Sequence, residues 1–173
     1  MRPKVTLLRG TFFALILCAI GNVPAKAGLD EGLAALQAGE YLTALEELLP
    51  LADAGNARAQ AEVGMIYHYG LTSAKNFAKA DNYYRRAAHQ ENPDGMIGLS
   101  VMNALGQGVA VNMTEAYKWL LLARDRLPEG RDRARVIGAL DSFRESMTQN
   151  EIETAEWRAR SWVPEQDSAG GAQ

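Results

Sequence analysis

Apolar residues recur at steps of three and four along most of the chain beyond residue 28. In the segment 57–69 such residues include Ala59, Val63 and Ile66, and Gly70 follows the segment. This spacing places apolar side chains on one face of a helix, and a glycine commonly ends one. No segment alternates apolar and polar residues in the two-step manner of a strand. The pattern therefore predicts an all-α protein.

Asparagines stand at the predicted starts of two helices. Asn76 precedes an apolar series over 77–88, and Asn112 precedes another over 113–126. An asparagine side chain accepts a hydrogen bond from a free N–H group in the first turn, which favours it at this position. Glu115, three residues after Asn112, adds the pattern of a capping box.

The chain repeats itself with a period of 36 residues. The identical positions at this offset include loop residues as well as alanines. They are Asn56 and Asn92, Gly70 and Gly106, Ala74 and Ala110, Asn76 and Asn112, and Ala80 and Ala116. One offset serves without gaps from residue 44 to residue 120. Self-similarity at such a period is typical of helical repeats that stack on one another.

We therefore predict an α-solenoid of about four helix pairs. The repeat domain covers 28–163, and its parts are three copies at about 28–56, 57–92 and 93–127 and a terminal capping pair at 129–163. The capping pair departs from the 36-residue spacing, as expected of a pair that covers the last apolar face of an array. Its second helix opens on Thr148 and Glu151, another capping-box pattern. We predict a disordered tail for 164–173.

The first 27 residues have the order of a secretory signal peptide. Basic residues at Arg2, Lys4 and Arg9 precede an unbroken apolar run at 12–20, and Ala25-Lys26-Ala27 follows. The run is shorter than the ~20 residues that span a bilayer, so we predict cleavage after Ala27, with an uncleaved anchor as the alternative. Cys18 follows a leucine and is interpreted as part of this segment, not as a lipidation site. The expected location is periplasmic or secreted, without stable membrane insertion after cleavage.

Charge and composition exclude several classes of function. The formal net charge is −3, and residues 1–27 hold four of the 18 basic residues and no acidic ones, so the remaining chain carries −7. This balance gives no electrostatic case for nucleic-acid binding. With one Cys and two His, the sequence predicts no disulfide, no metal site and no cofactor. No zinc-hydrolase, phosphate-loop or Ser-x-x-Lys motif is present, so no catalytic residue is predicted.

Residues 106–119 read Gly-Gln-Gly-Val-Ala-Val-Asn-Met-Thr-Glu-Ala-Tyr-Lys-Trp. This run resembles the turn and second helix of a Sel1-like repeat, a tetratricopeptide-like unit of about 36 residues. The resemblance covers about 29–126, although the copies are uneven: Ser100 and Asn103 stand where the preceding copy has Gly64 and Tyr67. The residues that match the structural motif are Gly64, Tyr67, Gly70, Ala80, Tyr84, Gly106, Gly108, Ala116 and Trp119.

The resemblance also implies which side chains line the hollow face of the array, since the first helix of each pair lines it. The implied positions form a mostly apolar stripe. They are Arg58, Ala61, Met65, His68, Tyr69, Asp94, Ile97, Val101, Ala104 and Leu105. An apolar groove suits an amphipathic helix or an extended peptide. The same stripe could instead pack against the ends of the protein itself. His68 in particular is expected to be a partly exposed surface residue.

The sequence thus favours a non-catalytic, exported adaptor or scaffold that binds a protein or peptide partner. Regulation of a cell-envelope process is implied by the resemblance alone. Two alternatives remain open at this point. One is a cell-wall-acting hydrolase, for which Glu62 and Asp94 are available carboxylates without a placed partner. The other is a self-associating structural element whose groove holds a helix of a neighbouring copy.

Overall fold

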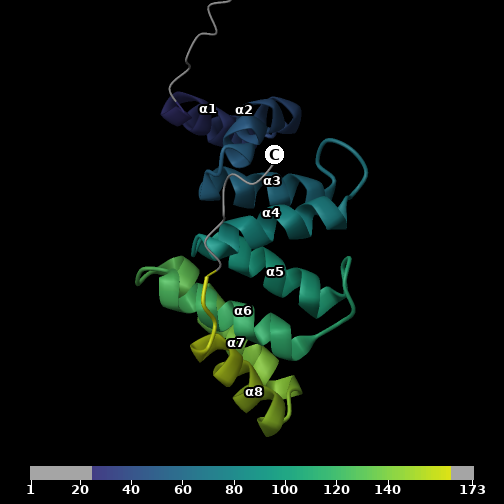
Figure 1. Ribbon diagram of the computed structural model, residues 1–173, viewed down its shortest axis with the longest axis vertical. Coiled ribbons are helices and arrows are strands. Elements are labelled where there is room, and N and C mark those ends of the chain that lie inside the picture. The colour runs from purple at the N-terminus through teal and green to yellow at the C-terminus, as the bar shows by residue number, and fades with distance from the viewer. Residues whose placement is uncertain (1–24, 165–173) are drawn as a thin grey trace, which may run out of the picture.

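The computed structural model describes residues 25–164 and is shown in Figure 1. Within this range the chain forms eight helices and no strand, which confirms the all-α prediction. The helices are α1 (Ala25–Ala38), α2 (Tyr41–Asp53), α3 (Ala57–Tyr69), α4 (Phe77–His89), α5 (Pro93–Leu105), α6 (Met113–Arg126), α7 (Arg131–Ser146) and α8 (Gln149–Arg160). Most of the predicted signal peptide, and the predicted tail beyond Pro164, lie outside the described residues.

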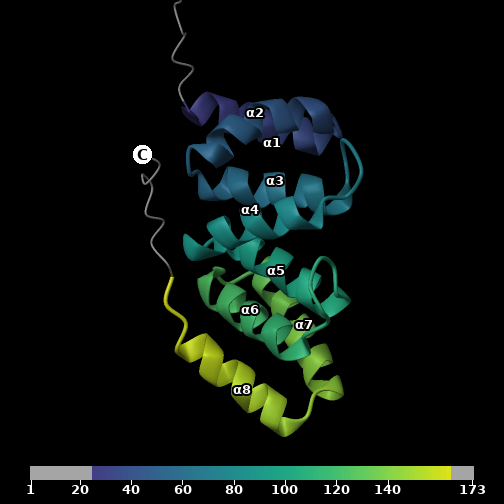
Figure 2. The same ribbon diagram turned by 45° about the vertical axis from the view of Figure 1, so that its right-hand side comes forward.

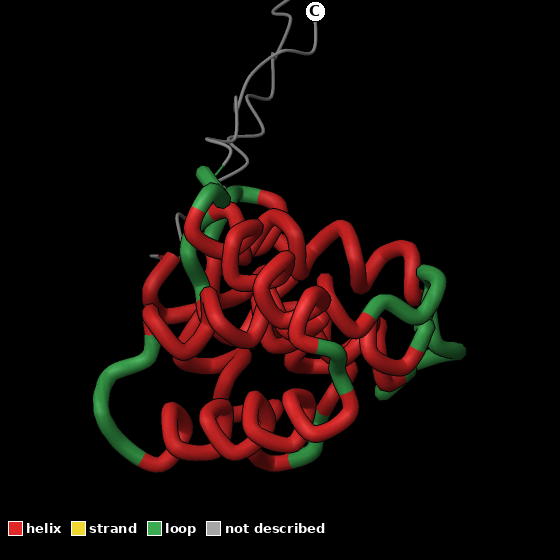
Figure 3. Tube along the Cα trace, turned by 90° about the horizontal axis from the view of Figure 1, so that it is seen from below, coloured by secondary structure: helices red, strands yellow, loops and turns green. Residues whose placement is uncertain are grey.

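The first six helices stack as three antiparallel pairs, α1 with α2, α3 with α4 and α5 with α6. Each helix also packs on the one that follows it, so the pairs build a continuous solenoid from top to bottom of Figure 1. The turned view shows the same order, and the view from below places the loops around the edge of the stack (Figures 2 and 3). The first helices of successive pairs, α3 and α5, are in direct contact.

Local signals at the helix ends repeat with the 36-residue period. The side chains of Asn56, Asn76, Asn92 and Asn112 each accept a hydrogen bond from a backbone N–H of the first turn. Gly70 and Gly106 end α3 and α5 with φ of 67° and 65°. A left-handed residue at this position lets the chain leave the helix sharply, and glycine adopts it without steric cost.

The two predicted capping boxes differ in outcome. The box at Thr148 and Glu151 is complete, with both reciprocal hydrogen bonds. At the start of α6 only the Asn112 half is present. The carboxylate of Glu115 pairs instead with Lys118 and Arg158, the latter at 3.4 Å on α8. One partner within α6 and one on α8 have therefore replaced the bond that the spacing predicted.

Small residues let neighbouring helices approach the ring of Tyr84. A Cβ atom at Gly64 of α3 would lie 2.7 Å from this ring, and one at Gly98 of α5 would lie 2.5 Å from it. Tyr84 is therefore clamped between two consecutive first helices, and it is only 4% exposed. Trp119 and the motif alanines Ala80 and Ala116 are buried in the same way.

The terminal pair is arranged differently from the others. Helices α7 and α8 each pack more closely on α6 than on each other, although Arg144 of α7 pairs with Glu156 of α8 at 3.3 Å, so they do not form a hairpin like those before them. Figure 2 shows α8 as a separate diagonal at the base of the molecule. Ile137, which the apolar series of α7 places beside Val136 on the packing face, is 41% exposed. Helix α7 therefore buries only a narrow stripe centred on Val136 and Leu140.

Trp162, just beyond α8, ties the end of the array to earlier helices. Its ring lies 5.8 Å from the ring of Trp119 on α6 and 6.1 Å from that of His89 at the end of α4. The guanidinium of Arg126 lies 5.4 Å from the same indole. The terminal pair therefore covers the outer side of α6 and reaches back to the preceding repeat.

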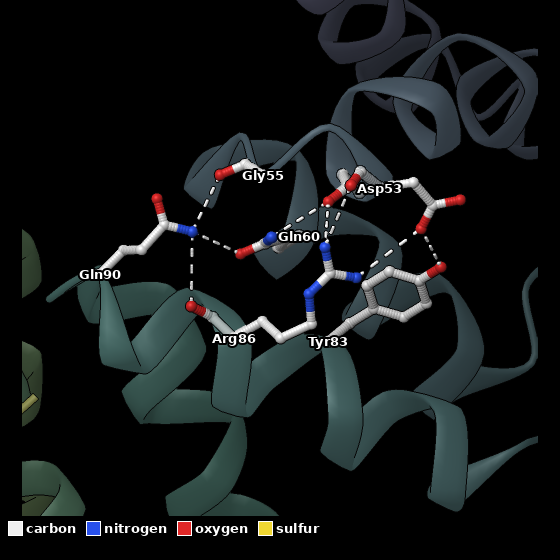
Figure 4. A network of polar contacts seen from close by, with 7 residues as sticks. Asp53, Gly55, Gln60, Tyr83, Arg86 and Gln90 are labelled. Atoms are coloured by element: carbon white, nitrogen blue, oxygen red, sulfur yellow. Dashed lines mark hydrogen bonds and ion pairs between the residues drawn. The ribbon is translucent and has the colours of Figure 1, made fainter. Parts of the chain in front are cut away.

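A polar network joins the first two pairs on the side of α4 (Figure 4). The Tyr83 hydroxyl donates to Asp53 at 2.8 Å, and Arg86 donates to the carbonyl of Ala52 at 2.8 Å. The Gln90 amide donates to the Gly55 carbonyl at 2.9 Å and to the Gln60 side chain at 2.8 Å. These bonds fix the rotation of one pair on the next.

Candidate partner-binding groove

The ten predicted hollow-face residues line two adjoining pockets. The upper pocket, of about 220 Å³, lies between α3 and α5. The lower pocket, of about 560 Å³, lies between α5 and α7 with α6 at its floor. Asp94, Ile97 and Val101 of α5 line both, so the two pockets adjoin along this helix, and together we call them the groove.

The accessibility of the predicted residues varies along the groove. Tyr69 and Leu105 are 54% and 63% exposed, while Ala61 is only 2% exposed. Met65, Ile97, Val101 and Ala104 are half-buried and form the walls. The structure brings the stripe together as a surface. Whether a partner binds it remains a prediction.

The sequence interpretation of His68 was wrong, because this side chain is buried at 2% exposure. Its Nε2–H donates to Oε1 of Gln107 at 2.6 Å, and Nδ1 accepts from the Tyr84 hydroxyl at 3.3 Å. Its ring also stacks on Tyr69, with 4.7 Å between centroids. Gln107 belongs to the turn of the next repeat, 39 residues along the chain, so a reading of local sequence could not place it over His68.

The upper pocket carries a group of three linked charges. Arg58 pairs with Glu62 on its own helix and with Asp94 on α5, each at 2.7 Å. Arg58 and Asp94 are 36 residues apart and therefore occupy equivalent positions in consecutive copies. Burial raises the pKa of the Glu62 carboxyl, while the neighbouring Arg58 opposes that shift. The group carries one negative charge in excess.

The lower pocket is mainly apolar. Its floor contains Leu120 and Leu127, and one wall contains Ala104 and Leu105. The opposite wall comes from α7 and consists of Val136, Ala139 and Phe143. Sequence reasoning missed this second wall, because it expected the terminal pair only to cover the last apolar face of the array. The separation of α7 from α5, which no local pattern encodes, turns those residues toward the pocket.

The groove shows little that suits chemistry. Among residues 25–164 no group of His, Cys, Asp and Glu side chains is placed to hold a metal ion. Both carboxylates of the hydrolase alternative, Glu62 and Asp94, are bound to the same guanidinium. In the same part of the chain, no helix is long and apolar enough to cross a membrane.

Comparison with known families decides the nature of the repeats. The model of the Sel1 repeat matches residues 57–92 and 93–126. The chain contains two Sel1 repeats. Sel1 repeat proteins generally act as protein-interaction scaffolds, and their fold is typically non-catalytic. No curated protein matches the chain.

Two solved structures share the fold of this chain. One is c5321, a protective antigen of uropathogenic Escherichia coli strains that displays an SLR fold, with a TM-score of 0.70 and 21% identity over 79% of this chain. The other is a Sel1 repeat protein from Oxalobacter formigenes, with a TM-score of 0.61 and 25% identity over 77% of this chain. The chain spans 29% and 54% of the lengths of these two proteins.

Proposed function

We propose that this protein is an exported adaptor that holds a segment of a protein partner in the groove between α3, α5 and α7. The observation that carries the proposal is the pair of adjoining, mostly apolar pockets on the first-helix face, open to solvent at Tyr69 and Leu105. Large exposed apolar side chains gathered in a concave surface mark interaction sites in soluble proteins. The general role of Sel1 repeats as scaffolds supports the same reading.

Photo-crosslinking from single positions tests the groove in cells that make the protein. A crosslinking residue at Leu105, in the lower pocket, should capture a discrete partner. The matched control is Leu42 on α2, which is as exposed as Leu105 but lies outside both pockets. Equal capture of the same partner from both positions would contradict binding in the groove.

Export is a separate part of the proposal, supported by the basic, apolar and small-residue order of the first 27 residues. N-terminal sequencing of the protein recovered from fractionated cells should find Gly28 as the first residue in the periplasmic or secreted fraction. Recovery from the cytoplasm with Met1 retained would overturn this part and leave the groove proposal intact.

A further inference from the structure

The lower pocket exists because α7 is displaced from the place that a regular repeat would occupy. The first helices α3 and α5 pack directly on each other, whereas α5 and α7 have at most marginal contact. The space between them measures about 560 Å³ and leaves Leu105 63% exposed. The gap therefore lies where the stack would otherwise continue with a helix against α5.

The residues that line the lower pocket favour a helical occupant over an extended one. The polar side chains around the lower pocket are Asp94, Ser100, Asp132 and Arg135, and Ser100 is only 1% exposed. An extended peptide would bring its backbone N–H and C=O groups against an apolar surface with few partners, and unpaired buried polar groups are costly. A helix satisfies its own backbone and presents only side chains.

The charges of the groove lie toward one end. Asp94 and Asp132 belong to the first turns of α5 and α7. An ion pair of 2.6 Å joins Glu91, just before α5, to Arg126 at the end of α6. Only four residues separate that end from the start of α7, so both acidic side chains lie near the C-terminal end of α6.

Neighbouring arginines only partly neutralise this end. Arg58 pairs with Asp94 and Glu62, and Arg135 lies 3.7 Å from Asp132. The lining of the lower pocket itself holds two carboxylates, Asp94 and Asp132, against the one guanidinium of Arg135. The rest of the groove is apolar, so a complementary occupant has a basic end and an apolar stripe.

We propose that the lower pocket binds one amphipathic α-helix of the partner, about three turns long, with Lys or Arg at the end beside Asp94 and Asp132. The length follows from the wall between Asp94 and Leu105, which spans about 17 Å of helix. The apolar side chains of the occupant follow the i, i+3 or i+4, i+7 spacing, because residues at this spacing lie on the helix face that contacts a groove. This inference rests on the proposed function and specifies the partner of the same site.

The test is selection from a displayed library of random peptides, each long enough for about four helical turns. The full chain from Gly28 is the target, and the variant Leu105→Asp removes binders that do not use the groove. Because Leu105 is exposed, this substitution should leave the fold intact, and Leu42→Asp is the matched control at equal exposure. We expect the enriched peptides to share a helical apolar period and a basic end.

Individual binders then establish how each contact contributes. Leu105→Asp should weaken binding by about tenfold or more, and Leu42→Asp should leave it within about twofold. Asp132→Asn should weaken peptides with a basic end and leave neutral peptides unchanged. Proline in the middle of a selected peptide should abolish binding, because it breaks a helix.

Three outcomes would overturn the proposal. Groove-dependent binders with a two-residue apolar period or internal prolines would show an extended occupant and would leave the proposed adaptor function standing. If no peptide binds the unchanged chain better than the Leu105→Asp variant, both the helical occupant and the use of the groove as a peptide site are overturned. A mass in light scattering that rises with concentration and returns to the monomer in Leu105→Asp would assign the pocket to a second copy of this chain.

Discussion

Tyr84 shows how one residue can set the spacing of two repeats. Its ring fills the space left by two glycines on consecutive first helices, and its hydroxyl is hydrogen-bonded to His68. Gly98→Ala places a methyl group about where the ring now lies, so the ring or the helix must shift. We expect a loss of ~1–3 kcal/mol in the free energy of unfolding, measured from urea unfolding curves.

Gly138 in α7 provides the matched control, since a Cβ there meets no atom within 4 Å. Gly138→Ala should keep or raise the free energy of unfolding by ~0.5–1 kcal/mol, because alanine is the better helix former. Equal losses for the two variants would show that the Tyr84 clamp is not the cause.

Glu91 occupies a backbone conformation that normally favours glycine. Its φ is 60°, and the equivalent residue of the preceding copy, Gly55, has a φ of 97°. The side chain of Glu91 pairs with Arg126 at 2.6 Å, an exposed pair worth ~0.2–1 kcal/mol. We expect the free energy of unfolding of Glu91→Gly to exceed that of Glu91→Ala by about 1 kcal/mol, because glycine removes the steric cost that alanine keeps. Thermal unfolding of both variants measures the difference, and a more stable alanine variant would contradict the reading.

At the scale of the element, the hydrogen bonds between pairs make α4 sensitive to alkaline pH. Burial raises the pKa of Tyr83 to about 12, and the hydrogen bond to Asp53 adds to the shift. The folded state therefore holds this proton more tightly than the unfolded chain, whose tyrosine titrates near 10. Stability should be lost as the pH rises from about 10 towards 12, because only the unfolded state ionises there.

Tyr83→Phe tests this directly. The variant should lose one late step in the ultraviolet titration of the tyrosines and should show a smaller loss of stability over that pH range. Tyr84 and Tyr117, whose pKa values burial also raises, remain in the variant as internal references. Loss of a step near pH 10 in place of the late one would mean that neither burial nor the Asp53 bond raises the pKa of Tyr83 in solution.

The helices themselves could be predicted because their signals are local. Asparagine caps, glycine ends and the 36-residue offset are all contained within one repeat, and the structure places Asn76, Asn112, Gly70 and Gly106 as those signals predict. The stripe of first-helix residues came from the resemblance to Sel1-like repeats, and two of its members, Arg58 and Asp94, meet at the repeat distance.

What could not be predicted depends on contacts between distant segments. The burial of His68 requires the turn at Gln107, and the wall at Phe143 requires the displacement of α7. Both α7 and α8 have ordinary amphipathic patterns that would also suit a regular hairpin. Their choice of α6 as a common partner is decided by the whole set of apolar faces around Tyr117, Leu121 and Ala155.

At the scale of the molecule, most contacts join neighbours along the stack, as expected of a linear repeat array. The buried side chains fall into three clusters, one around α1–α3, one around α4–α6 and one around α6–α8. Arrays of this kind need not unfold in a single step, since each interface contributes separately. The contact of Trp162 with His89 and Trp119 couples the last two clusters.

The positions of the tryptophans make intrinsic fluorescence a local probe of unfolding in this protein. The chain has three tryptophans, Trp119, Trp157 and Trp162, and all belong to α6, α8 or the residues just after α8. Intrinsic fluorescence therefore reports on the last two clusters, whereas circular dichroism reports on every helix. If the first helix pairs unfold separately from the rest, fluorescence and circular dichroism will give different midpoints in one denaturant titration. Coincident midpoints would instead show that the three clusters melt together.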